Sequence, residues 1–155
     1  MSHIDLPILL CLVLCLGGWI TMCIAGPCDH GWYYRNGTCY KFHHEKKNWI
    51  DANNTCTAQN ARLVHIKYLE LNTYLAVTAA TVFNDMYWIG LRRTDYYEYR
   101  NFNENNATTL KWFIGEPNNG VLACVYSQGG FMKDHSCDDP AAGVPRGFIC
   151  QGIIY

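Results

Sequence analysis

The sequence predicts an α+β fold, and three observations carry that prediction. Two helical patterns come first, near residues 48–59 and 69–81, whereas short apolar strands separated by long polar turns follow from Tyr87 onward. Six cysteines are spread over the polar part of the chain, which is typical of exported domains closed by disulfides. The length of 155 residues corresponds to one domain.

The N-terminal segment predicts export. Residues 6–16 form an almost unbroken apolar run, and the small residues Ala25 and Gly26 precede the polar part of the chain. We therefore expect residues 1–25 to be a signal peptide cleaved near Ala25, so that the mature protein is secreted, extracellular and without a membrane span. A retained membrane anchor is the alternative, because the start of the segment lacks Lys and Arg and the apolar run to Ile24 is nearly long enough to cross a bilayer.

The cysteine count agrees with cleavage. Three of the nine cysteines lie in the expected signal peptide, which leaves an even number. The spacing of the remaining cysteines favours the pairs Cys28 with Cys39, Cys124 with Cys137, and Cys56 with Cys150. The first pair brackets an Asn36-Gly37 hairpin turn, and the second brackets a hairpin with Gly129-Gly130 at its tip. The cysteines are not expected to bind a metal, because there is no Cys-x-x-Cys pair.

The first helix is expected from Asn48 to Gln59, because Trp49, Ala52 and Cys56 share one face. A second helix is expected at residues 69–81, although three threonines weaken the pattern. Strands are expected at residues 63–66, 87–91, 123–126 and 147–151.

The charge balance disfavours nucleic acid as a partner. The chain holds 12 Lys and Arg against 13 Asp and Glu, and no basic stripe is present to neutralise a phosphate backbone. No nucleophile and base stand in a catalytic arrangement, so we do not expect an enzyme.

The most informative motif places oxygen-bearing side chains around a proline. Glu116, Pro117 and Asn118 follow Trp112 in a turn, and Asp134 follows the second predicted hairpin. Carboxylate and carboxamide oxygens are the ligands of a hard cation such as calcium.

Together these motifs resemble the C-type lectin-like domain, over Cys28 to Gln151. The matching segments are the six cysteines, Trp49, residues 88–91, residues 112–118, residues 134–137 and residues 148–150. The resemblance implies a domain at residues 28–151 with a double-loop fold: two helices, antiparallel sheets, three disulfides paired as above, and a long upper loop at about residues 92–121.

The resemblance also implies a site. In the family, one calcium ion holds vicinal sugar hydroxyls, and Glu116, Asn118 and Asp134 match residues that bind both the calcium and the carbohydrate. The Glu-Pro-Asn motif implies glycans of mannose, N-acetylglucosamine or fucose type rather than galactose. Pro117 is expected in a cis peptide bond, which aims the flanking side chains the same way.

Two residues of this chain differ from the family pattern at the predicted calcium site. Lys133 stands where the family has a neutral ligand, and Leu122 stands where it has a carboxylate. A lysine near calcium is repelled by the ion, and Lys133 is instead expected to pair with Glu116 or Asp134.

Two functions therefore stay open. The first is a secreted carbohydrate-binding lectin in which calcium is an uncertain cofactor. The second is a calcium-independent module that binds an extracellular protein or matrix partner without binding sugar. Self-association into a homo-oligomer is open in both.

Three Asn-x-Thr sequons predict N-glycosylation, at Asn36, Asn53 and Asn106. Asn36 and Asn106 lie in predicted turns and are the better acceptors, whereas Asn53 lies on the first predicted helix.

Overall fold

The structure is a computed structural model, and it describes residues 10–13, 21–24, 27–82, 86–93, 99–101, 110–120, 122–138 and 146–152. The predicted glycosylation site Asn106 and much of the predicted upper loop fall outside these residues.

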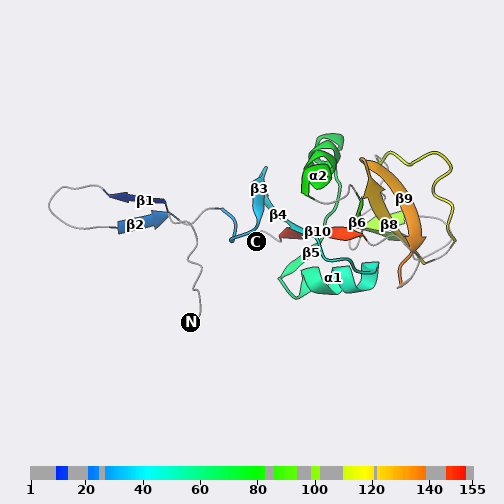
Figure 1. Cartoon of the computed structure of the whole chain (residues 1–155), viewed down its shortest axis with the longest axis horizontal. Coiled ribbons are helices and arrows are strands. Elements are labelled where there is room, and N and C mark those ends of the chain that lie inside the picture. Colours follow the sequence, from blue (N-terminus) through cyan, green and yellow to red (C-terminus); the bar gives the residue numbers. More distant parts are fainter. Residues whose placement is uncertain are drawn as a thin grey trace.

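Two short strands precede the domain. Strand β1 (Leu10–Val13) pairs antiparallel with β2 (Thr21–Ile24) in a two-stranded sheet of their own, and Figure 1 draws this hairpin apart from the other elements. Both strands lie within the segment predicted to be a signal peptide, which stays a prediction. In the described part of the chain, no helix is both long and apolar enough to cross a bilayer.

The other described strands form one eight-stranded sheet. They are β3 (Tyr33–Arg35), β4 (Thr38–His43), β5 (Ala61–Leu63), β6 (Met86–Arg93), β7 (Tyr99–Asn101), β8 (Ala123–Gln128), β9 (Phe131–Ser136) and β10 (Gly147–Gly152). The main path runs β3-β4-β10-β6-β8-β9, with β5 added beside β10 and β7 beside β6. The expectation of antiparallel sheets holds for every pair except one: β10 inserts between β4 and β6 and runs parallel to β6.

The two helices cover different sides of the sheet. Helix α1 (Trp49–Thr57) and helix α2 (Leu69–Val82) match the two predicted helices, and Figure 1 shows β10 and β6 passing between them. Successive side chains of a strand point to opposite faces, so Phe148 packs in the core under α1 and Ile149 packs in the core under α2.

Helix α1 begins where the sequence predicts. The Asn48 side chain accepts a hydrogen bond from the Asp51 backbone N–H at 2.7 Å, which caps the first turn. The predicted stripe of Trp49, Ala52 and Cys56 is buried. The Trp49 indole donates to the Ile89 carbonyl at 2.7 Å, which fixes α1 on β6.

The strand predicted at residues 63–66 is displaced. Strand β5 ends at Leu63, and the next three residues are buried without alternating in and out. The Val64 N–H donates to the Ile149 carbonyl at 2.9 Å and the His65 N–H donates to the Gln151 side chain at 3.1 Å. At His65 a side-chain oxygen therefore takes the place of the backbone acceptor that a neighbouring strand would supply. The apolar pattern of the sequence does not reveal this substitution.

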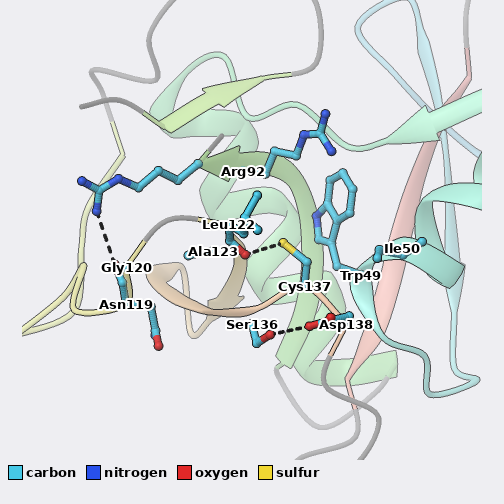
Figure 2. A pocket seen from close by; sticks show the side chains of 11 residues that line it. Trp49, Ile50, Arg92, Asn119, Gly120, Leu122, Ala123, Ser136, Cys137 and Asp138 are labelled. Carbon is cyan, nitrogen blue, oxygen red and sulfur yellow. Dashed lines mark hydrogen bonds between the residues drawn. The ribbon is translucent and has the colours of Figure 1, made fainter. Parts of the chain in front are cut away.

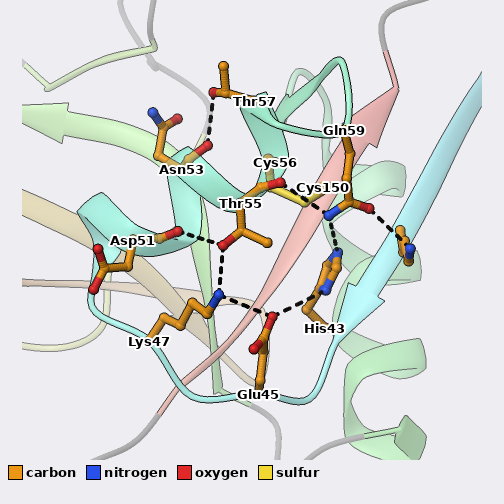
Figure 3. Close-up of a disulfide and its surroundings, with 11 residues drawn as sticks. His43, Glu45, Lys47, Asp51, Asn53, Thr55, Cys56, Thr57, Gln59 and Cys150 are labelled. Atoms are coloured by element: carbon orange, nitrogen blue, oxygen red, sulfur yellow. Dashed lines mark hydrogen bonds and ion pairs between the residues drawn. A yellow bond between two sulfur atoms is a disulfide. The ribbon is translucent and has the colours of Figure 1, made fainter.

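All three expected disulfides are present, and they join Cys28 to Cys39, Cys56 to Cys150, and Cys124 to Cys137. The second bridge ties α1 to β10 within the core. Figure 3 shows the polar network beside it, in which Lys47 Nζ donates to Thr55 at 2.8 Å and lies 3.2 Å from Glu45.

The two described sequons differ in their surroundings. Asn36 is exposed at the β3–β4 turn with a left-handed φ of 45°. Asn53 lies in α1, and its sequon partner Thr55 both donates to the Asp51 carbonyl and accepts from Lys47. Asn36 therefore stays the better predicted acceptor of the two.

Gly90 on β6 is expected to be irreplaceable even by alanine. A Cβ there would lie 2.6 Å from the Leu63 carbonyl oxygen and 2.6 Å from the His65 ring. We expect Gly90→Ala to lower the free energy of unfolding by about 2 kcal/mol in urea denaturation, because packed backbone must move. Gly120→Ala is the matched control, since a Cβ there meets nothing within 4 Å; equal stability of the two variants would contradict this packing.

Candidate functional site

The Glu-Pro-Asn turn lies along the outer edge of β9. Two backbone hydrogen bonds hold the preceding segment there, from Met132 N–H to the Lys111 carbonyl at 2.7 Å and from Phe113 N–H to the Met132 carbonyl at 2.9 Å. Gly115 follows with a left-handed φ of 85°. The Glu116–Pro117 peptide bond is cis, as expected.

Asp134 on β9 is the centre of the site. It is 3% exposed. One carboxylate oxygen accepts the Asn118 backbone N–H at 3.0 Å, and the other accepts the Asn119 N–H at 3.0 Å. The Tyr99 hydroxyl donates to the same carboxylate. Asp134 thus brings the turn and β7 together.

The Asn119 carboxamide lies among the oxygens of the site. Its Nδ2 is 2.7 Å from the Asp134 backbone carbonyl, 3.2 Å from Asp134 Oδ1 and 3.1 Å from Asn118 Oδ1. These are oxygens that the family resemblance gives to a calcium ion. A neutral N–H₂ group therefore satisfies acceptors that a cation would otherwise satisfy.

Glu116 and Asp134 interact with each other. Burial and the hydrogen bond with Asp134 raise the pKa of Glu116. Burial alone would raise the pKa of Asp134 as well, but hydrogen bonds from Tyr99, Glu116 and the turn outweigh it and lower that pKa. As the pH falls, Glu116 therefore takes up a proton before Asp134 does.

Tyr99 is tied to the same cluster. Burial and its hydrogen bond to Asp134 raise the pKa of Tyr99, so the hydroxyl stays a donor at neutral pH. Its ring packs 4.8 Å from the Trp112 ring, centroid to centroid. Arg93 reaches the cluster from β6, with Nη1 donating to the Asn119 carbonyl at 3.3 Å.

The prediction that Lys133 pairs with Glu116 or Asp134 is wrong. Among the described residues, Lys133 forms neither ion pair. Its ammonium lies 4.1 Å from the centre of the Phe113 ring, a cation–π contact. Adjacent residues of a strand face opposite sides, so Lys133 points away from the site that Asp134 faces.

The structure agrees with the second difference from the family pattern, the leucine at position 122 in place of a carboxylate. Leu122 is 67% exposed with a left-handed φ of 68°, and it contributes no side-chain oxygen. In the part of the chain that the structure describes, no group of three or more His, Cys, Asp or Glu side chains gathers at one point.

The remaining donors nevertheless suit a hard cation. They are two carboxylates, the Asn118 carboxamide oxygen and the Asp134 carbonyl. Glu116 Oε2 is buried and has no hydrogen-bond partner among the described residues, so it has acceptor capacity that a cation or a hydroxyl can use once neighbouring groups move. The set is small, and the Asn119 amide must move before a cation enters it.

Of the site residues that the sequence predicts, Glu116, Asn118 and Asp134 lie together. Asn119, Tyr99 and Arg93 are additions to the predicted set. The repeated Asn at 118–119 was the available signal for the first. The sequence placed Tyr99 and Arg93 in a tyrosine- and arginine-rich segment that could meet a sugar or a protein, but it did not predict their contacts with the Asp134 cluster.

A family model described as "Lectin C-type domain" matches residues 45–151. The chain belongs to the C-type lectin domain family. Members of this family are binding modules, so membership supports the prediction that the protein is not an enzyme. The double-loop fold, with two helices and three disulfides, is that of the family.

Two curated relatives show how varied the family is. The chain is 31% identical over 122 residues to "CD209 antigen-like protein D" of Mus musculus, covering 74% of this chain and 50% of the relative. It thus spans half the length of that protein. It is 33% identical over 132 residues to "Snaclec coagulation factor IX/factor X-binding protein subunit B2" of Trimeresurus stejnegeri, covering 82% of this chain and 84% of the relative.

A solved structure is also similar. The C-type carbohydrate-recognition domain of cow CD23, determined in the presence of a GlcNAc2Man3 oligosaccharide, superposes with a TM-score of 0.71 at 29% identity, covering 83% of this chain and 97% of that one. The same family thus includes a carbohydrate-recognition domain determined with an oligosaccharide and a subunit of a protein that binds coagulation factors. Family membership therefore does not identify the ligand of this C-type lectin domain, and the ligand has to be inferred from the geometry of its own site.

Proposed function

We propose that this C-type lectin domain is secreted and binds glycans of mannose, N-acetylglucosamine or fucose type at the cluster of Glu116, Asn118 and Asp134. The observation that carries the proposal is the buried Asp134, which gathers the Glu-Pro-Asn turn against β9 by hydrogen bonds to two consecutive backbone N–H groups. That arrangement holds side-chain oxygens and amides close together at one edge of the sheet.

Vicinal sugar hydroxyls suit this set of groups. Each hydroxyl both donates and accepts, and so needs an acceptor and a donor beside it. Glu116 Oε2 has acceptor capacity to spare. Asn118, which is exposed, supplies a carboxamide with both kinds of group. A diol that meets Glu116 and Asn118 together is therefore matched at both of its oxygens.

Calcium, when bound, would be held by Glu116, Asn118 and Asp134 and would coordinate two sugar hydroxyls. The resident Asn119 amide competes with it for the oxygens of Asn118 and Asp134. We therefore propose that calcium binding is weak and that glycan recognition also relies on direct hydrogen bonds from the protein.

Asn119→Asp is expected to raise the affinity for calcium about tenfold or more. The change removes the competing donor and adds a carboxylate beside the oxygen set, and calcium affinity rises with ligand charge. Isothermal titration of calcium into both proteins measures the difference. Asn54→Asp is the control, because it adds the same charge on the exposed surface of α1; equal affinity of Asn119→Asp and the native protein would rule out competition by the amide.

A glycan array tests the proposed function. The native domain and Asp134→Asn are compared in calcium and in EDTA. We expect the native protein to select mannose-, N-acetylglucosamine- or fucose-terminated glycans, with signals reduced but not lost in EDTA, and the variant to lose them in both. An array with no glycan above background in either buffer would refute the proposal.

A protein-binding role is the second candidate, and an exposed apolar surface favours it. Ile114 is 94% exposed, and the neighbouring Phe113 is 44% exposed. Phe131, which is also 44% exposed, has its ring 6.3 Å from the Phe113 ring, centroid to centroid. Large exposed apolar side chains that lie together often mark protein contacts. A glycan array without signal, from a domain that is shown to be folded, would favour this protein-binding role.

A further inference from the structure

Asn119 is followed by Gly120, and this Asn-Gly pair lies in the candidate site. The only other Asn-Gly pair of the chain is Asn36-Gly37. Glycine has no Cβ, so its backbone nitrogen approaches the carboxamide of the preceding asparagine without a side chain in the way. An asparagine that precedes glycine therefore loses its amide more readily than one that precedes a bulkier residue. Nothing in the proposed function uses this chemistry.

The reaction needs only water as a co-reactant. The Gly120 backbone nitrogen gives up its proton and bonds to Asn119 Cγ, and the bond from Cγ to Nδ2 breaks, which releases ammonia. A water molecule then opens the resulting succinimide ring. Attack of water at Cγ leaves an aspartate in an unchanged main chain, whereas attack at the main-chain carbonyl leaves an isoaspartate, in which the chain runs through the side chain. Both products carry a carboxylate in place of the amide.

The surroundings of the pair give this ring room to form. The reacting atoms belong to adjacent residues, so rotations of the Asn119 side chain and of the neighbouring backbone bring them together. Gly120 is exposed, and a Cβ built on it meets nothing within 4 Å. The pair lies outside the helices and strands, and both residues line a pocket of about 400 Å³ (Figure 2), so water has access to them.

Hydrogen bonds hold the Asn119 amide and slow the reaction. Its Nδ2 lies 2.7 Å from the Asp134 backbone carbonyl, 3.2 Å from Asp134 Oδ1 and 3.1 Å from Asn118 Oδ1. These contacts have to open before Cγ turns toward the Gly120 nitrogen. Conversion is therefore slower in the folded domain than in an unfolded chain, and it belongs to aged protein rather than to newly made protein.

Conversion removes the donor that satisfies this set of oxygens. An aspartate at position 119 places an oxygen where Nδ2 lay, among the Asp134 carbonyl, the Asp134 carboxylate and the Asn118 carboxamide. Oxygens that lie together without a donor repel one another. A calcium ion relieves this repulsion, because it takes several oxygen ligands and its affinity rises with their charge. The loss of one amide thus removes a competitor of calcium and adds a ligand for it.

We propose that Asn119-Gly120 is a deamidation site, and that its conversion to aspartate changes the cluster from one occupied by an amide into a calcium site. The calcium part of this inference rests on the proposed function, because it uses the oxygens of Asn118 and Asp134. The deamidation itself does not. The affinity of the domain for calcium therefore rises with the age of the protein, although the encoded sequence stays the same.

The test follows the Asn119-Gly120 pair alone. All proteins carry Asn36→Asp, which removes the other pair and places aspartate, a residue that left-handed turns accept, at a φ of 45°. This background protein and its Gly120→Ala and Asn119→Asp derivatives are kept at physiological temperature and mildly alkaline pH in ¹⁸O-labelled water. Gly120→Ala is the control, because its Cβ hinders ring closure and meets nothing within 4 Å. Asn119→Asp is the reference for complete conversion.

Two readouts follow the conversion and its consequence. Peptide mass spectrometry measures ¹⁸O uptake at position 119, and co-elution with the Asn119→Asp peptide identifies the aspartate product. Ion exchange isolates the converted protein, which has gained a negative charge. Titration calorimetry then measures its affinity for calcium beside that of fresh protein.

We expect ¹⁸O uptake at Asn119 in the folded background protein and about tenfold less in Gly120→Ala. The converted protein should bind calcium about tenfold more tightly than fresh protein and as tightly as Asn119→Asp. No uptake at Asn119 in the folded protein, under conditions in which the unfolded protein converts, would overturn the inference. Conversion to aspartate without a gain in calcium affinity would overturn it as well. Neither readout uses a sugar, so a glycan array without signal is a separate failure, that of the proposed function.

Discussion

Asp134→Ala is expected to abolish retention of the domain on a mannan column and to lower the free energy of unfolding by about 3 kcal/mol. The side chain is almost fully buried and accepts hydrogen bonds from two backbone N–H groups of the turn and from the Tyr99 hydroxyl. Alanine leaves those donors without an acceptor, and each unsatisfied donor in a buried position is costly. The turn then loses its attachment to β9, and with it the arrangement of Glu116 and Asn118.

Column retention and urea denaturation measure the two effects separately. Asp29→Ala is the control, because Asp29 is exposed and far along the chain from the cluster. A variant that keeps native stability but loses retention would place Asp134 in binding alone. Retention equal to that of the native protein would contradict its role in the site.

The double variant Cys56→Ala/Cys150→Ala is expected to lose about 4 to 5 kcal/mol of stability, much of what a domain of this size possesses. The bridge closes a loop with a sequence separation of 94, the largest of the three, so its removal frees the most conformational entropy in the unfolded chain. Both cysteines are fully buried, and the smaller side chains also leave a cavity between α1 and β10.

The double variant Cys28→Ala/Cys39→Ala is the matched comparison, because that bridge spans a separation of only 11 and its cysteines are not fully buried. Thermal and urea unfolding of both variants should rank the long bridge as the more stabilising. Equal losses would mean that loop length and burial do not set the contribution of these disulfides.

Local patterns in the sequence were sufficient for most of the elements. The stripe of Trp49, Ala52 and Cys56 located α1, and the Asn36-Gly37 pair located the β3–β4 turn, where both residues have left-handed φ values of 45° and 78°. Such signals depend on neighbouring residues only, so no knowledge of the tertiary fold is needed to find them.

Two backbone features that depend on distant partners were not predicted. The parallel pairing of β6 with β10 arises because the last strand of the domain enters the middle of the sheet. The early end of β5 depends on the side chain of Gln151, which bonds to the His65 N–H. Neither partner is close in sequence.

The candidate site also contains residues that the sequence predicted and residues that it did not. Glu116, Asn118 and Asp134 came from the family motif, whereas the position of Asn119 follows from how the turn docks on β9. The prediction for Lys133 was wrong because it considered only the charge of the side chain. Side chains alternate in direction along a strand, and this alternation directs Lys133 to Phe113. The orientation of a strand face, rather than the residue type, decided that contact.

The most direct test of the glycan site is a ¹H–¹⁵N NMR titration of the native domain with methyl α-mannoside, first in EDTA and then in calcium. We expect saturable shifts of the Asn118, Asn119 and Asp134 amides in both buffers, with tighter binding in calcium. An absence of shifts at these three amides at saturating sugar in both buffers would contradict it.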